Sequence, residues 1–121
     1  MIKKNDELKL DVHQEFRGGK GSVTMKHFMD RKMANGMGRL FVHGMLPPGA
    51  SVGLHKHEGD CEVYYILEGR ALVNDNGTEA ELGPGDINFC PDGGSHGIEN
   101  IGADDLHYIA IILFSTQQSP D

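Results

Sequence analysis

Turn-forming residues divide most of this chain into short segments, and this punctuation limits what the chain can fold into. Asn76-Gly77 predicts a β-hairpin, because both central residues of a type I′ turn need a positive φ angle. The run 83–86, Gly-Pro-Gly-Asp, predicts a type II turn with proline second and glycine third. Short apolar or alternating segments lie between such turns, at intervals of roughly 8–12 residues. The pattern predicts an all-β sandwich or barrel.

The β pattern begins after residue 37. Strands are expected at 39–46, 63–67, 71–74, 78–82, 87–90 and 106–114. We therefore expect a single β domain over 38–115, preceded by an N-terminal arm and flanking segment (1–37) and followed by a polar tail (116–121) that frays. Asp30 and Gly36 are suited to begin and end one or two helical turns at 31–35, the only helix expected.

Composition narrows the classes of partner. The chain has 121 residues, enough for one domain, and a net charge of -7, which argues against nucleic acids and anionic membrane surfaces. No apolar run reaches the ~18 residues of a membrane span, and the N-terminus lacks the apolar core of a signal peptide. Cys61 and Cys90 are too few for a disulfide framework. We expect reduced thiols in a cytoplasmic protein whose partner is a small molecule.

Four residues have side chains that can converge on one metal ion. His55 and His57 flank Lys56, and on a strand residues two apart point to the same face. The four residues before Glu62 suffice for a turn, so the next strand can return a carboxylate to the pair. His96 follows a loop of turn formers that can aim one more imidazole inward.

Three neutral imidazoles and one carboxylate suit a single divalent transition-metal ion: Mn²⁺, Fe²⁺, Co²⁺, Ni²⁺ or Zn²⁺. An octahedral ion with these four ligands keeps positions free for water, dioxygen or a chelating substrate. A His-x-His pair by itself is weak support for such a site. The residues around it are more specific.

Two sets of spaced residues resemble the two sequence motifs of the cupin superfamily. The first motif, with its family spacing, is met by Gly49, His55, His57, Glu62 and Gly69. The second is met by Gly85, Pro91, Gly93, His96 and Asn100. Residues 59–69 further resemble small bacterial cupins labelled mannose-6-phosphate-isomerase-like or oxalate-decarboxylase-like.

The resemblance implies an antiparallel jelly-roll barrel of about six to eight strands with the ion inside one mouth. It also implies that His55, His57, Glu62 and His96 are the metal ligands and that the protein is a homodimer. Both faces of the segment 63–67 are apolar, which fits a contact between subunits.

Three further residues are candidates for a substrate pocket: Tyr64, His43 and Phe41. Alternation from Glu62 places Tyr64 on the inner face, where it can either donate its hydroxyl near the metal or fill the barrel. His43 alternates with Phe41 and can face the cavity or act as a hydrogen-bonded structural residue. No residue is marked as a catalytic acid or base.

Two functions remain open. The first is a metal-dependent enzyme of the isomerase, decarboxylase or dioxygenase type, acting on a small polar metabolite. The second is a metal-dependent module that binds or senses a small molecule without turnover. No cluster of Arg and Lys near the motifs supports a sugar-phosphate isomerase, and no acidic lid loop supports an oxalate decarboxylase. Fold and motif do not decide the reaction.

Overall fold

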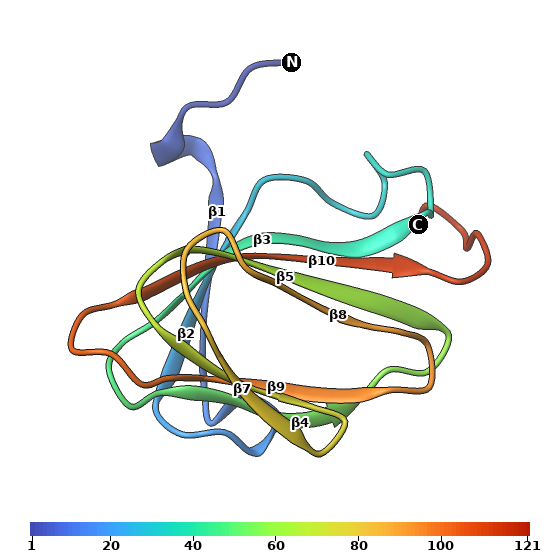
Figure 1. Ribbon diagram of the computed structural model, residues 1–121. Helices are drawn as coiled ribbons and strands as arrows, with labels where there is room; N and C mark the ends of the chain where they lie inside the picture. The colour runs from blue at the N-terminus through green and yellow to red at the C-terminus, as the bar shows by residue number, and fades with distance from the viewer.

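A computed structural model describes all residues, 1–121, and consists almost entirely of β-strands (Figure 1). The strands are β1 (Lys9–Gln14), β2 (Ser22–His27), β3 (Gly38–Leu46), β4 (Ser51–Lys56), β5 (Asp60–Glu68), β6 (Ala71–Asp75), β7 (Thr78–Leu82), β8 (Ile87–Cys90), β9 (Ser95–Asn100) and β10 (Leu106–Phe114). Two 3₁₀ turns, η1 (Asn5–Glu7) and η2 (Phe16–Gly18), are the only helical elements. No helix has the length and apolar character needed to cross a bilayer.

The strands form two antiparallel sheets that pack face to face. One sheet has the order β1-β2-β3-β10-β5-β8, and the other has the order β4-β9-β6-β7. In Figure 1 the sheets form two layers, with β3, β10 and β5 in one and β4, β9 and β7 in the other. The predicted all-β, antiparallel jelly roll is confirmed, with ten strands instead of about six to eight.

The extra strands come from the expected N-terminal arm. β1 pairs with β2, and β2 pairs with β3, so residues 1–37 extend the six-stranded sheet. Val23 and Met25 on β2 belong to the buried core. The arm is therefore packed on the domain because its inward residues are apolar.

The segment 31–36 forms consecutive hydrogen-bonded turns instead of a regular helix. The Asp30 carboxylate accepts a hydrogen bond from the Met33 amide, as expected of a capping residue. Positive φ angles at Asn35 and Gly36 then end the segment. The Gly36 carbonyl accepts a hydrogen bond from the Gln118 amide, so the polar tail contacts this turn.

The core lies between the sheets and follows strand alternation. Val42, Leu46, Ile66 and Ile98 are fully or almost fully buried there. The other face of the six-stranded sheet remains apolar but uncovered. Its exposed residues include Tyr65, Leu67, Ile87, Phe89 and Leu113.

Candidate metal centre

Both sheets contribute to the cluster of four predicted ligands. His55 lies on β4, His57 directly follows β4, Glu62 lies on β5 and His96 lies on β9. One ligand atom from each lies within 4.8 Å of the others. We call these four residues the His₃Glu cluster. The sequence predicted that these four side chains, from separate segments, would converge at one point, and the geometry agrees.

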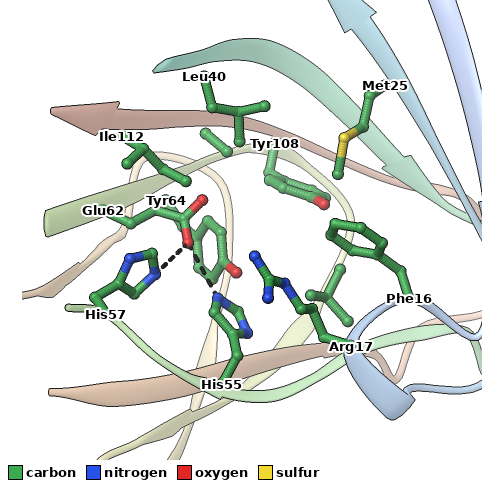
Figure 2. Close-up of a pocket in the computed structure, with 12 residues that line it drawn as sticks. Phe16, Arg17, Met25, Leu40, His55, His57, Glu62, Tyr64, Tyr108 and Ile112 are labelled. Atoms are coloured by element: carbon green, nitrogen blue, oxygen red, sulfur yellow. Dashed lines mark hydrogen bonds and ion pairs between the residues drawn. The ribbon is translucent and has the colours of Figure 1, made fainter. Parts of the chain in front are cut away.

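The Glu62 carboxylate contacts all three imidazoles, and Figure 2 shows its contacts with His55 and His57. Its Oε1 atom is 2.7 Å from His96 Nε2, 3.0 Å from His57 Nε2 and 3.4 Å from His55 Nε2. The Nε2 atoms of His57 and His96 are themselves 3.2 Å apart. The three rings therefore present the same nitrogen to one small volume.

The opposite nitrogen of each ring is held by an acceptor. His57 Nδ1 donates to Asp60 Oδ1 at 2.6 Å, and His55 Nδ1 donates to the Gly53 carbonyl at 2.7 Å. His96 Nδ1 donates to Asn88 Oδ1 at 2.7 Å. These hydrogen bonds fix the orientation of the rings and place the proton of the neutral imidazole on Nδ1.

Consequently, three Nε2 lone pairs and a carboxylate oxygen meet in a buried volume. Such electron pairs repel one another unless protons or a cation lie between them. The donors are three imidazole nitrogens and one carboxylate oxygen, and both sheets hold them in position. Divalent transition metals accept such a donor set. The residues thus fit the ion that the sequence pattern implies.

Electrostatics in the cluster favour negative charge on Glu62. Burial alone would raise the pKa of Glu62, but contacts with the three imidazoles hold it well below its ordinary value. The hydrogen bond to Glu62 raises the pKa of His57, whereas burial lowers the pKa of His96. Burial also raises the pKa of the Cys90 thiol to about 11, and Cys90 is not among the four residues whose ligand atoms converge.

Asp60 connects the cluster to the outside of the domain. Its second oxygen accepts a 2.9 Å hydrogen bond from Arg39 Nε, while the first holds His57.

Asp60→Asn keeps an acceptor for His57 but removes the charge. We expect the affinity for Mn²⁺ or Zn²⁺ to fall about 10-fold, as outer partners of metal-binding histidines commonly contribute. Calorimetric titration tests this, with exposed Asp105→Asn as the matched control; equal affinities in both variants would contradict the role of Asp60.

A small cavity of about 30 Å³ adjoins the cluster. His55, His57, Glu62 and Tyr64 contribute to its wall. The rest of the wall is mostly apolar: Met25, Leu40, Val52, Tyr108, Ala110 and Ile112. A space of this size holds on the order of two water molecules, so it admits only a small ligand beside the cluster.

Tyr64 borders both the cavity and the cluster. Its ring stacks on His96 with centroids 4.5 Å apart and an angle of 8° between the planes. The same ring meets Tyr108 edge to face. Burial raises the pKa of Tyr64 well above its ordinary value, so the hydroxyl stays protonated. Tyr64 therefore both packs the barrel and lines the pocket.

The other two pocket candidates, His43 and Phe41, do not reach the cavity. Leu40 and Val42 occupy the inward positions of β3, and alternation turns His43 and Phe41 to the opposite face of the sheet. His43 Nε2 lies 2.9 Å from His107 Nδ1 there. Of the two roles considered for His43, facing the cavity or forming a structural hydrogen bond, the second matches this position.

One charged residue at the cavity was not predicted from the sequence. Arg17 on η2 lines the cavity wall, and Figure 2 shows its side chain extending toward Tyr64 and His55. Asp60 and Asn88, which orient the imidazoles, were also not predicted. No motif marks these three residues, because each reaches the site through the fold and not through spacing.

Comparisons with known proteins agree with the fold. The family model described as "Cupin domain" matches residues 42–112. An "Oxalate-binding protein" of Thermotoga maritima is 43% identical over 113 residues, which cover 93% of each protein. An uncharacterized protein of Methanocaldococcus jannaschii is 34% identical over 82 residues, covering 68% of this chain and 65% of its own length.

Solved structures show the same architecture. The crystal structure of a protein from Thermotoga maritima, described as a predicted oxalate decarboxylase, aligns with a TM-score of 0.90 and 43% identity. The alignment covers 94% of this chain and 99% of that one. A sugar phosphate isomerase from Silicibacter pomeroyi aligns with a TM-score of 0.65 and 20% identity, over 77% of this chain and 60% of its own, and shares the fold alone.

Proposed function

This chain belongs to the cupin family, and on that premise we propose that it uses one metal ion to bind a small chelating carboxylate such as oxalate. The ligands of the ion are His55, His57, Glu62 and His96. The ion is a divalent transition metal: Mn²⁺, Fe²⁺, Co²⁺, Ni²⁺ or Zn²⁺. When bound, it supplies Lewis-acid attraction for carboxylate oxygens.

The observation that carries this proposal is the meeting of three Nε2 atoms and the Glu62 carboxylate while every Nδ1 is held elsewhere. A closed structural site would surround the ion with protein. Here the cluster adjoins a cavity, so exogenous ligand atoms can approach it.

The size and lining of the cavity support the ligand class. A cavity of about 30 Å³ favours a compact ligand over a sugar phosphate, which the isomerase interpretation would require. Oxalate is a compact chelator of hard and borderline metal ions. The name of the Thermotoga maritima relative, an oxalate-binding protein, supports the same ligand for this chain.

The proposal is tested by metal analysis followed by calorimetry. The protein is stripped with a chelator, reloaded with Mn²⁺ or Ni²⁺ and titrated with oxalate, with succinate as a longer dicarboxylate. We expect about one ion per chain, and oxalate binding by the loaded protein but not by the stripped protein. Failure to retain any ion, or equal oxalate binding with and without it, would overturn the proposal.

Turnover of the same ligand is a second candidate. It is favoured by the buried hydroxyls of Tyr64 and Tyr108, which line the cavity and can donate hydrogen bonds to a carboxylate there. Steady formation of formate and carbon dioxide from oxalate, reduced in Tyr64→Phe, would support the enzyme. A rise in melting temperature with oxalate, but no product, supports the binding module.

We further propose that a second copy of this chain covers the uncovered face of the six-stranded sheet. Ile87 and Phe89 are 56% and 52% exposed, and Tyr65 and Leu67 continue the same apolar face. A two-fold axis would pair this patch with itself.

Phe89→Glu is expected to yield a monomer by light scattering. Leu54→Glu, a substitution at an exposed apolar position of the other sheet, should leave the dimer intact. A monomeric wild-type protein would overturn this assignment.

Cys61 and Cys90 are both free thiols. Free thiols are the usual state in a reducing compartment, so we also propose a cytoplasmic location.

A further inference from the structure

We propose that Arg17 binds the second carboxylate of the ligand and thereby makes the site selective for a small dianion over a monoanion. This inference rests on the proposed function. It adds a residue that lies outside both sequence motifs and comes from the N-terminal segment of the chain.

Arg17 is the only arginine whose side chain has no polar partner in the protein. Arg39 is bonded to Asp60, Arg70 to Glu81, and Arg31 to the Ser119 carbonyl. The Arg17 guanidinium instead lies 5.5 Å from the Phe16 ring centroid and lines the cavity (Figure 2). Its five donors are thus free to bind a ligand there.

The backbone of η2 is held in a conformation that non-glycine residues rarely adopt. Glu15 and Arg17 have φ angles of 50° and 56°, in the left-handed region. Each such residue costs on the order of 1 kcal/mol, so the surrounding structure must enforce it. The Phe16 side chain, between them in sequence, packs against the core and anchors the turn.

Two glycines allow the backbone of this turn to contact the backbone of β4. A Cβ atom on Gly53 would lie 2.0 Å from the Arg17 carbonyl oxygen, and one on Gly19 would lie 2.1 Å from the Ser51 carbonyl oxygen. Only glycine allows the two backbones to approach this closely. The Ser51 amide also donates a 2.8 Å hydrogen bond to the Lys20 carbonyl. The position of Arg17 is therefore fixed relative to the strand that carries His55.

Charge balance indicates what such a site accepts. A divalent ion with the Glu62 carboxylate leaves a local charge of about +1, and Arg17 raises it to about +2. Arg17 is exposed, whereas the Glu62 carboxylate is buried, so Arg17 lies where a ligand enters from solvent toward the cluster. A guanidinium binds a carboxylate through two parallel hydrogen bonds. Oxalate that chelates the metal through one oxygen of each carboxylate still has two outer oxygens, and the outer oxygen of its second carboxylate can accept hydrogen bonds from Arg17.

The test compares ligands that differ in charge. Arg17→Gln, Arg17→Lys and the wild type are loaded with Mn²⁺ and titrated with oxalate and with acetate. We expect Arg17→Gln to bind oxalate about 10- to 100-fold more weakly, with metal content and acetate affinity unchanged. Arg17→Lys should recover part of the oxalate affinity, because the charge returns without the planar fork. Arg70→Gln, an exposed arginine paired with Glu81, is the matched control and should behave as wild type.

The outcomes separate this inference from the proposed function. If the wild type binds metal and oxalate but Arg17→Gln binds oxalate within about 2-fold of it, the inference on Arg17 is wrong and the proposed function stands. An equal loss of acetate and oxalate affinity also overturns it, since selectivity for the dianion is then absent. If the loaded wild type binds no oxalate, both fail.

Discussion

Glu62→Gln is expected to release the metal ion from the protein after dialysis, whereas the wild type should retain about one ion per chain. Glutamine keeps the size of the side chain but removes the negative charge that contacts all three imidazoles. Loss of an outer partner of a metal ligand costs about 10- to 100-fold in affinity, so loss of a direct ligand should cost more than about 100-fold. Metal content by mass spectrometry measures this.

His57→Ala should give the same loss, and the fold should persist in both variants because the main core cluster is apolar. His107→Ala is the control, since this partly exposed histidine lies on the other face of the sheet. Circular dichroism establishes that each variant is folded. Retention of a full equivalent of metal by folded Glu62→Gln and His57→Ala would show that the ion binds elsewhere.

Gly53→Ala is expected to have the largest effect on stability of any single methyl addition near the site. The new Cβ would meet the Arg17 carbonyl at 2.0 Å and its carbon at 2.9 Å, and both belong to backbone that cannot rotate away. Insertion of a methyl group into a packed site costs about 1–3 kcal/mol, and a contact with backbone falls at the upper end. Urea denaturation of the wild type and variant measures the difference.

Gly53→Ala should also weaken oxalate binding, because the turn that carries Arg17 must move. The Gly53 carbonyl in addition orients the His55 ring. Gly83→Ala is the matched control: nothing lies within 4 Å of a Cβ at this position. If both variants lose the same stability, the close contact between η2 and β4 is not what makes Gly53→Ala costly.

Local turn chemistry made most of the fold predictable. Asn76 and Gly77 have φ angles of 51° and 98° and join β6 to β7, as the dipeptide predicts. Strand β9 was not predicted, because its inward positions carry polar residues. His96 and Asn100 are buried there, where alternation would lead one to expect aliphatic side chains. The functional residues themselves obscured the strand.

The candidate ligands were predictable because their spacing along the chain reflects their geometry in the sheets. His55 and His57 lie two residues apart, and Glu62 returns on the next strand. Arg17 and Asp60 had no such signal. Arg17 reaches the cavity only because two non-glycine residues adopt positive φ angles, which sequence patterns do not reveal.

The position of β10 has a consequence for synthesis of the protein. This strand, residues 106–114, comes last of the ten strands in chain order, yet it pairs with both β3 and β5 in the middle of the six-stranded sheet. A nascent chain still holding these residues in the ribosomal tunnel has β3 and β5 as open edges that lack a partner. The sheet can therefore close only after residues 106–114 have emerged, and until then the exposed edges are open to chaperones or to self-association.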